Sequence, residues 1–120
     1  MAVNAVNEIV STIASGASAS SVANFEKEQR LFSVRVPSGF TEANLALQVS
    51  FDDGANWEFI SKKGAHVVVT AVAGEVCNVE NPVDLAVYPA FRFLSVSKTD
   101  NTTPVVQSAA RSLQLLCRSF

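Results

Sequence analysis

The sequence predicts an all-β fold, an antiparallel β-sandwich or jelly roll of about eight strands. Three observations predict it. Apolar and polar residues alternate in many short runs, which is the period of a strand with one buried face. Turn-forming Gly, Pro, Asn and Asp separate these runs at a spacing of roughly 8–12 residues. The composition agrees, because 48% of the 120 residues are hydrophobic, only 17% are charged, and Val, Ser, Asn and Thr outnumber the helix-favouring Lys, Glu, Leu and Gln.

The N-terminal part of the chain is ambiguous. A chain of this length has room for one core, so we expect one sandwich domain, residues 21–120, preceded by a flexible N-terminal arm, residues 1–20. A possible first strand lies near Glu8–Ala14, but the same apolar spacing also fits a helical face. The small residues of Ser15–Ser21 favour a loop, and the arm is a candidate for a segment that orders on a neighbouring subunit.

Seven further runs carry the strand pattern. Pro37 and Gly39 end the first of them, because proline lacks the N–H that a ladder needs and glycine permits a turn. Ala73–Glu75 and Thr99–Pro104 are predicted turns, and Asn78–Asn81 is predicted to be a polar crossing. The predicted strands are Leu31–Val36, Leu45–Phe51, Trp57–Ile60, His66–Val72, Pro82–Tyr88, Ala90–Lys98 and Val105–Arg118. The side chains predicted to be mainly buried are Leu45, Leu47, Val49, Phe51, Trp57, Val69, Leu85, Val87, Phe93, Leu113 and Leu115.

The clearest local signal is a β-hairpin over Leu45–Ile60, and its turn carries a motif. The turn resembles the Asp box, S-x-D-x-G-x-T-W, at Ser50, Asp52, Gly54 and Trp57. Asn stands at position 56 where the motif usually has Thr, and a single copy argues against a propeller, which repeats its motif in each blade. We predict a structural turn in which Asp52 accepts backbone N–H bonds and Gly54 has a positive φ.

Two binding alternatives include residues in or next to this turn. Its oxygen ligands could hold calcium, but a polar turn needs no ion, and the spacing is not that of an EF-hand. Exposed aromatic residues could stack on sugar rings in a carbohydrate-binding module, but aromatic residues more often fill the core of a small domain. The candidate calcium ligands are Asp52, Asp53, Asn56 and Glu58, and the candidate sugar platform is Trp57, Tyr88 and Phe91. We predict no metal and no cofactor.

The remaining chemistry does not indicate an enzyme. His66 is the single histidine, without a partner set for a metal centre or a proton relay, and a structural or exposed role is expected. Cys77 and Cys117 are too few and too far apart for a disulfide framework or a zinc site, so both are expected to be free thiols. The net charge of −2 and the absence of a dense basic cluster disfavour nucleic acid as a partner. The sequence shows neither a signal peptide nor a run long enough to span a membrane, so we expect synthesis in a cytoplasm.

A family pattern extends over most of the chain, from about Ile9 to Arg118. It consists of the strand Leu45–Phe51, Ser50-x-Asp52-Asp53-Gly54-x-x-Trp57, Arg92-Phe93-Leu94-Ser95-Val96, and Pro104-Val105-x-Gln107-x-Ala109-Ala110-Arg111-x-Leu113-x-Leu115. This pattern resembles small β-sandwich virion proteins encoded among the structural genes of tailed bacteriophages and prophages.

The resemblance implies a function and partners. Such proteins are usually head decoration or cement proteins, head fibres, or neck and tail components. We therefore expect a non-enzymatic virion structural protein, made in the host cytoplasm, that decorates a capsid as a homo-oligomer through contacts with capsid or other virion proteins. A neck or tail component and a carbohydrate-binding module remain the alternatives, and neither nucleic acid nor a membrane is an expected partner.

Overall fold

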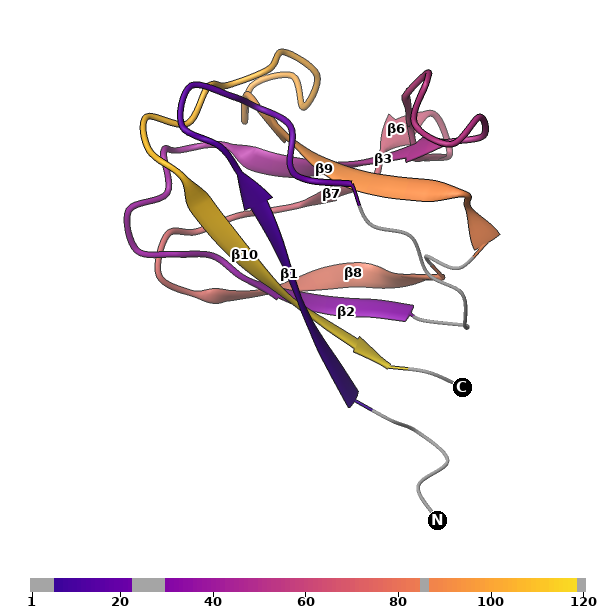
Figure 1. Cartoon of the computed structure of the whole chain (residues 1–120), viewed down its shortest axis with the longest axis horizontal. Helices are drawn as coiled ribbons and strands as arrows, with labels where there is room; N and C mark the ends of the chain where they lie inside the picture. The colour runs from indigo at the N-terminus through magenta and orange to yellow at the C-terminus, as the bar shows by residue number, and fades with distance from the viewer. Residues whose placement is uncertain (1–5, 23–29, 85–86, 119–120) are drawn as a thin grey trace.

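The computed structural model describes residues 6–22, 30–84 and 87–118, and every regular element within these ranges is a β-strand (Figure 1). The strands are β1 (Val6–Ile13), β2 (Arg30–Arg35), β3 (Asn44–Ser50), β4 (Glu58–Phe59), β5 (Ser61–Lys62), β6 (Ala65–His66), β7 (Val68–Val69), β8 (Val76–Asp84), β9 (Ala90–Val96) and β10 (Arg111–Arg118). In the described part of the chain, no helix is long and apolar enough to cross a membrane.

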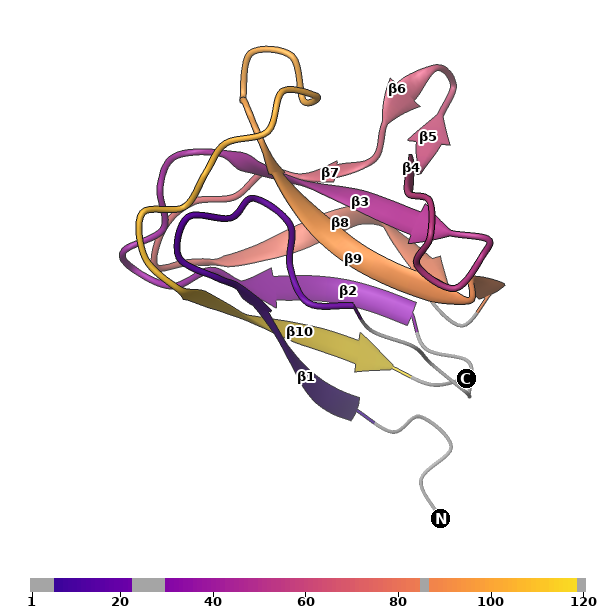
Figure 2. The ribbon, with the colours of Figure 1, turned by 45° about the horizontal axis from the view of Figure 1, so that its top comes forward.

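The strands form two facing antiparallel sheets and one small hairpin. The first sheet has the order β1-β10-β2-β8, and the second has the order β4-β3-β7 with β9 paired to the other side of β3. Strands β5 and β6 pair with each other. Figure 2 shows the first sheet as one layer and β3, β7 and β9 as the other. The predicted all-β, sandwich-like fold is therefore confirmed.

The core lies between the two sheets, where the alternation of each strand places its apolar side chains. The inner face of β3 supplies three of them, and β9 and β10 supply further ones. Burial is confirmed for the predicted core residues Leu45, Leu47, Val49, Val69, Phe93, Leu113 and Leu115.

Two of the predicted core residues are exposed instead. The side chain of Phe51 is 68% exposed, because β3 ends at Ser50 and Phe51 already belongs to the turn. The side chain of Val87 is 69% exposed, because β8 ends at Asp84 and Val87 lies in the connection to β9. Trp57 is only half-buried, and the predicted burial of Leu85 lies outside the described residues.

The predicted first strand exists, and it belongs to the sandwich. All eight residues of β1 pair with β10, from Val6 opposite Arg118 to Ile13 opposite Arg111. The chain then crosses to the second sheet, where the Ser20 N–H donates to the Phe93 carbonyl (2.8 Å). The structure thus makes residues 6–13 of the predicted arm a strand of the first sheet, joined through a loop to the bridge between Ala19 and Leu94 of the second sheet, and residues 1–5 lie outside the described residues.

Several predicted strand limits are corrected. The run His66–Val72 is divided, because His66 pairs with β5 whereas Val68–Val69 pairs with β3. The supposed crossing Asn78–Asn81 and the start of the run Pro82–Tyr88 form the continuous strand β8. The run Val105–Arg118 becomes a strand only at Arg111, because Gln107 turns into the molecule and bonds to neighbouring loops.

Candidate interaction surface

The outer face of the first sheet is open to solvent and partly apolar. Residues on this face alternate with the core residues of the same strands, so the cross-strand registers align Val10, Gln114, Arg35 and Val76 in one row. Leu116 and Ser33 lie opposite each other in the next row. Three exposed aliphatic side chains thus share one face, Val10 (57% exposed), Val76 (57%) and Leu116 (38%).

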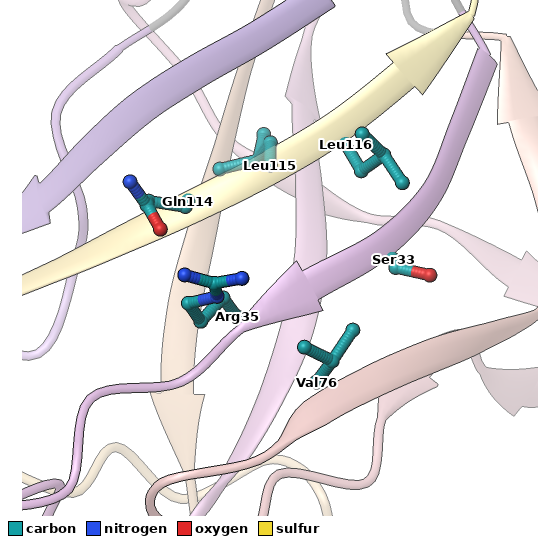
Figure 3. A pocket seen from close by; sticks show the side chains of 6 residues that line it. All are labelled: Ser33, Arg35, Val76, Gln114, Leu115 and Leu116. Carbon is teal, nitrogen blue, oxygen red and sulfur yellow. The ribbon is translucent and has the colours of Figure 1, made fainter. Parts of the chain in front are cut away.

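A shallow depression of about 140 Å³ lies in the middle of this face (Figure 3). Its lining comes from β2, β8 and β10 and consists of Ser33, Arg35, Val76, Gln114, Leu115 and Leu116. The hydroxyl of Ser33 is engaged, because it donates to Oδ1 of Asn78 at 2.7 Å.

Arg35 gives the depression its charge. Its side chain is exposed, and no hydrogen bond or ion pair joins it to any residue in the described ranges. Figure 3 shows the guanidinium group on the same face as the Gln114 amide, with Val76 on the neighbouring strand. This combination of one unpaired cation, a neutral amide and aliphatic side chains suits a protein surface that carries a carboxylate among apolar groups.

The outer face of the second sheet is closed by the chain's own loops. Ala46, Leu94 and Val96 are buried there, and partly buried hydrophobic residues pack against them. The β5–β6 hairpin and the loop after β9 meet above this face, where Nδ1 of His66 lies 3.1 Å from the Asn101 carbonyl oxygen. The two outer faces therefore differ: among the described residues, that of the first sheet carries exposed aliphatic side chains, whereas that of the second is covered.

The turn after β3 has the geometry predicted for an Asp box. The N–H of Asn56 donates to Oδ1 of Asp52 (2.8 Å), and the Ser50 hydroxyl donates to the same oxygen (2.7 Å). The Gly54 N–H donates to Oγ of Ser50 (2.8 Å), and Gly54 has a φ of 97°. The side-chain bonds from Asn56 and Ser50 lower the pKa of Asp52 to about 2. The predictions for Asp52 and Gly54 are confirmed, and the contacts of Ser50 are structural.

The structure does not form the proposed sugar platform. Phe91 is buried in the core at 5.0 Å from Phe93, between ring centroids. The Arg92 guanidinium carbon lies 4.3 Å from the centroid of the Trp57 ring and covers one side of it. Tyr88 instead lies beside the exposed ring of Phe51, at 6.1 Å between centroids. The three aromatic residues therefore do not share an exposed surface.

The candidate calcium ligands are not arranged as a cation site. The carboxylate of Asp52 is already occupied by Ser50 and Asn56 within the turn. Within residues 6–22, 30–84 and 87–118, no three side chains of His, Cys, Asp or Glu are grouped so that they could hold a metal ion. The half-buried His66 has structural contacts, because its ring stacks on Phe59 at 4.1 Å between centroids.

The two cysteines are buried free thiols, as predicted. Strand order explains why they are not bonded to each other. Cys117 lies in β10 and Cys77 in β8, and β2 lies between these strands. Two strand spacings amount to about 9–10 Å, whereas the two Cα atoms of a disulfide are about 4.4–6.8 Å apart. Burial raises the pKa of the Cys117 thiol to about 11.

The open face was not identified from the sequence. Alternation within each strand showed which residues point away from the core, such as Arg35 and Gln114, but not which strands are neighbours. The surface depends on β1, β10, β2 and β8 lying side by side, and these strands are far apart in the sequence. Comparison with family models, with curated proteins and with solved structures finds no match for the chain.

Proposed function

We propose that this chain is a non-enzymatic structural protein of a tailed-phage virion, a capsid decoration protein that acts through protein–protein contacts. The resemblance of its turn and strand motifs to small virion β-sandwiches supports the virion assignment. The open outer face of the first sheet is the observation that supports the mode of action.

The chemistry of that face suits a contact repeated many times on a shell. Val10, Val76 and Leu116 offer aliphatic area on a rigid sheet, where binding orders little additional chain. Arg35 adds one charge that selects an acidic partner surface. A decoration protein needs only modest affinity at each site, because multiple linked contacts combine into avidity.

Mass spectrometry of purified virions tests the assignment. A decoration protein is expected at a copy number comparable with that of the major shell protein. A few copies per particle would instead support the neck or tail alternative, and absence from the particles would refute both.

Two variants test the contact surface separately from the assignment. Arg35→Glu and Leu116→Lys are expected to lower the occupancy of particles without lowering the melting temperature, because both side chains lie on the surface. Lys62→Glu and Val72→Lys are matched controls: Lys62 is exposed on β5, and Val72 is 42% exposed, close to the 38% of Leu116. Normal occupancy by both test variants would show that another surface makes the contact.

A further inference from the structure

Strand β1 forms an edge of the first sheet and has an unpaired side. Its one strand partner in the described part of the chain is β10. In an antiparallel ladder, successive residues direct their N–H and C=O groups alternately to the two sides. Thr12 directs its groups to the open side, because the Ser21 N–H donates to the Thr12 carbonyl (2.9 Å) and the Thr12 N–H donates to Oγ of Ser21 (3.2 Å). By the same alternation, Val6, Glu8 and Val10 present their backbone groups on this side.

Only part of this edge is covered by the chain itself. The Thr12–Ser21 bonds and the bridge between Ile13 and Ser20 close its end near the second sheet. Along Val6–Val10, no described residue forms a backbone hydrogen bond to the open side of β1. Figure 2 shows this part of β1 at the margin of its layer, with β10 on one side only.

The opposite edge of the sheet differs. Strand β8 includes Pro82, which has no N–H to donate, and its pairing with β2 shifts register between Leu31 and Ser33. Proline and bulges are devices that protect an edge strand from pairing with another chain. The segment Val6–Val10 has one charged residue, Glu8, but it contains no proline and its register with β10 is unbroken, so it is the less protected edge.

We propose that β1 pairs antiparallel with β1 of a second copy of this chain. A two-fold axis beside Val6–Val10 brings identical open edges together, so each copy both donates to and accepts from the other. The two four-stranded sheets then form one continuous sheet. Val10 on the outer face and the half-buried Ile9 on the inner face lie at the seam, where pairing removes apolar surface from water.

The contact is short, so the dimer is weak. Five residues from each copy take part, whereas a standard stable interface uses roughly 20–30 residues a side. Dimerisation is therefore expected to depend on concentration. The proposal concerns the isolated chain and does not rest on the virion assignment, so each can fail without the other.

Sedimentation velocity of the purified chain, from about 10 µM to about 1 mM, tests the proposal. The wild-type mass is expected to rise from 12.8 kDa towards twice that value. Val10→Lys is expected to abolish the rise, because a lysine on an edge strand disfavours pairing with another chain. Val76→Lys is the matched control, because Val76 has the same 57% exposure on the same face but lies on the opposite edge.

Three outcomes would overturn edge pairing. The first is a wild-type chain that stays monomeric throughout the series. The second is equal weakening of the dimer by Val10→Lys and Val76→Lys, which would indicate packing through the sheet face. The third comes from hydrogen exchange of the wild-type chain, which requires no variant. The Val10 amide is expected to exchange more slowly at the highest concentration, and an unchanged rate would exclude pairing at this edge.

Discussion

The side chain of Gln107 and the backbone of Thr41 are paired in both directions. The Thr41 N–H donates to Oε1 of Gln107 (2.8 Å), and Nε2 of Gln107 donates to the Thr41 carbonyl (3.2 Å). The same amide nitrogen donates to Oγ of the buried Ser95 (3.0 Å). Gln107 is fully buried, and its backbone also bonds to Gly16 and Ala17, so one residue joins three loops at one end of the sandwich.

Replacing Gln107 by leucine should destabilise the fold. The substitution fills the site but leaves polar groups of Thr41 and Ser95 without their partner, at a cost of about 1–3 kcal/mol for a buried unpaired group. Chemical denaturation measures the free energy of unfolding. Gln114→Leu, in the exposed row of β10, is the control and should unfold close to wild type. Equal stabilities of the two variants would show that the buried amide contributes nothing.

The turn after β3 should be sensitive at two positions. Gly54→Val should lower stability by about 1–3 kcal/mol, because a β-branched residue is strained at positive φ. Asp52→Ala should lower the melting temperature, because the Asn56 N–H and the Ser50 hydroxyl lose their acceptor. Asp53→Asn is the control, because asparagine tolerates the φ of 58° at this position. The Asp-box assignment fails if Gly54→Val and Asp52→Ala both melt like wild type.

Two turn carboxylates should make stability depend on acid pH. Hydrogen bonds lower the pKa of Asp52 and of Asp100 to about 2, the latter through Thr103 and Thr102. The pKa of an aspartate in an unfolded chain is about 3.9. Each of the two carboxylates therefore stabilises the fold at pH values above about 4. This contribution is lost as the pH falls through the folded pKa of about 2. Urea denaturation at several pH values measures the free energy of unfolding. Between about pH 4 and about pH 2, the double variant Asp52→Asn with Asp100→Asn should lose less of this free energy than the wild type. An equal dependence on pH in the two proteins would refute the assignment.

The cysteines should be protected in the folded chain. Because Cys77 and Cys117 are buried, a thiol reagent at neutral pH should react with both slowly in native protein. The raised pKa of Cys117 further reduces its thiolate fraction. Under denaturing, non-reducing conditions both thiols should titrate. Recovery of neither thiol would mean that a disulfide forms in spite of the strand order.

The sequence alone predicted the structure correctly where the pattern lay within a single strand or turn. The alternation of Leu45, Leu47 and Val49 predicted β3 and its buried face, and the polar turn with Gly54 predicted where the chain reverses. Phe51 was misplaced because alternation continues formally for one residue beyond Ser50, whereas the ladder ends there.

Other features depend on neighbours that the sequence does not identify. In β2 the pairing with β10 shifts register between Ser33 and Leu31, where two steps of β2 oppose one step of β10, so Leu31 and Val34 both reach the core although strict alternation would separate them. Asn78 interrupts an apolar run, yet it lies on the outer face of an edge strand, where a polar residue is favourable. The open surface around Arg35 is likewise a product of strand order.

The pairing of β1 with β10 also bears on how the protein is made. Val6 lies opposite Arg118, so β1 has no strand partner until residues 111–118 have emerged from the ribosome. Until then the backbone groups that β1 and β2 direct towards β10 have no strand partner, because β10 lies between these two strands. Contacts so distant in sequence form slowly. The first sheet can therefore close only after residues 111–118 have been made, and its apolar strands lack these partners until then.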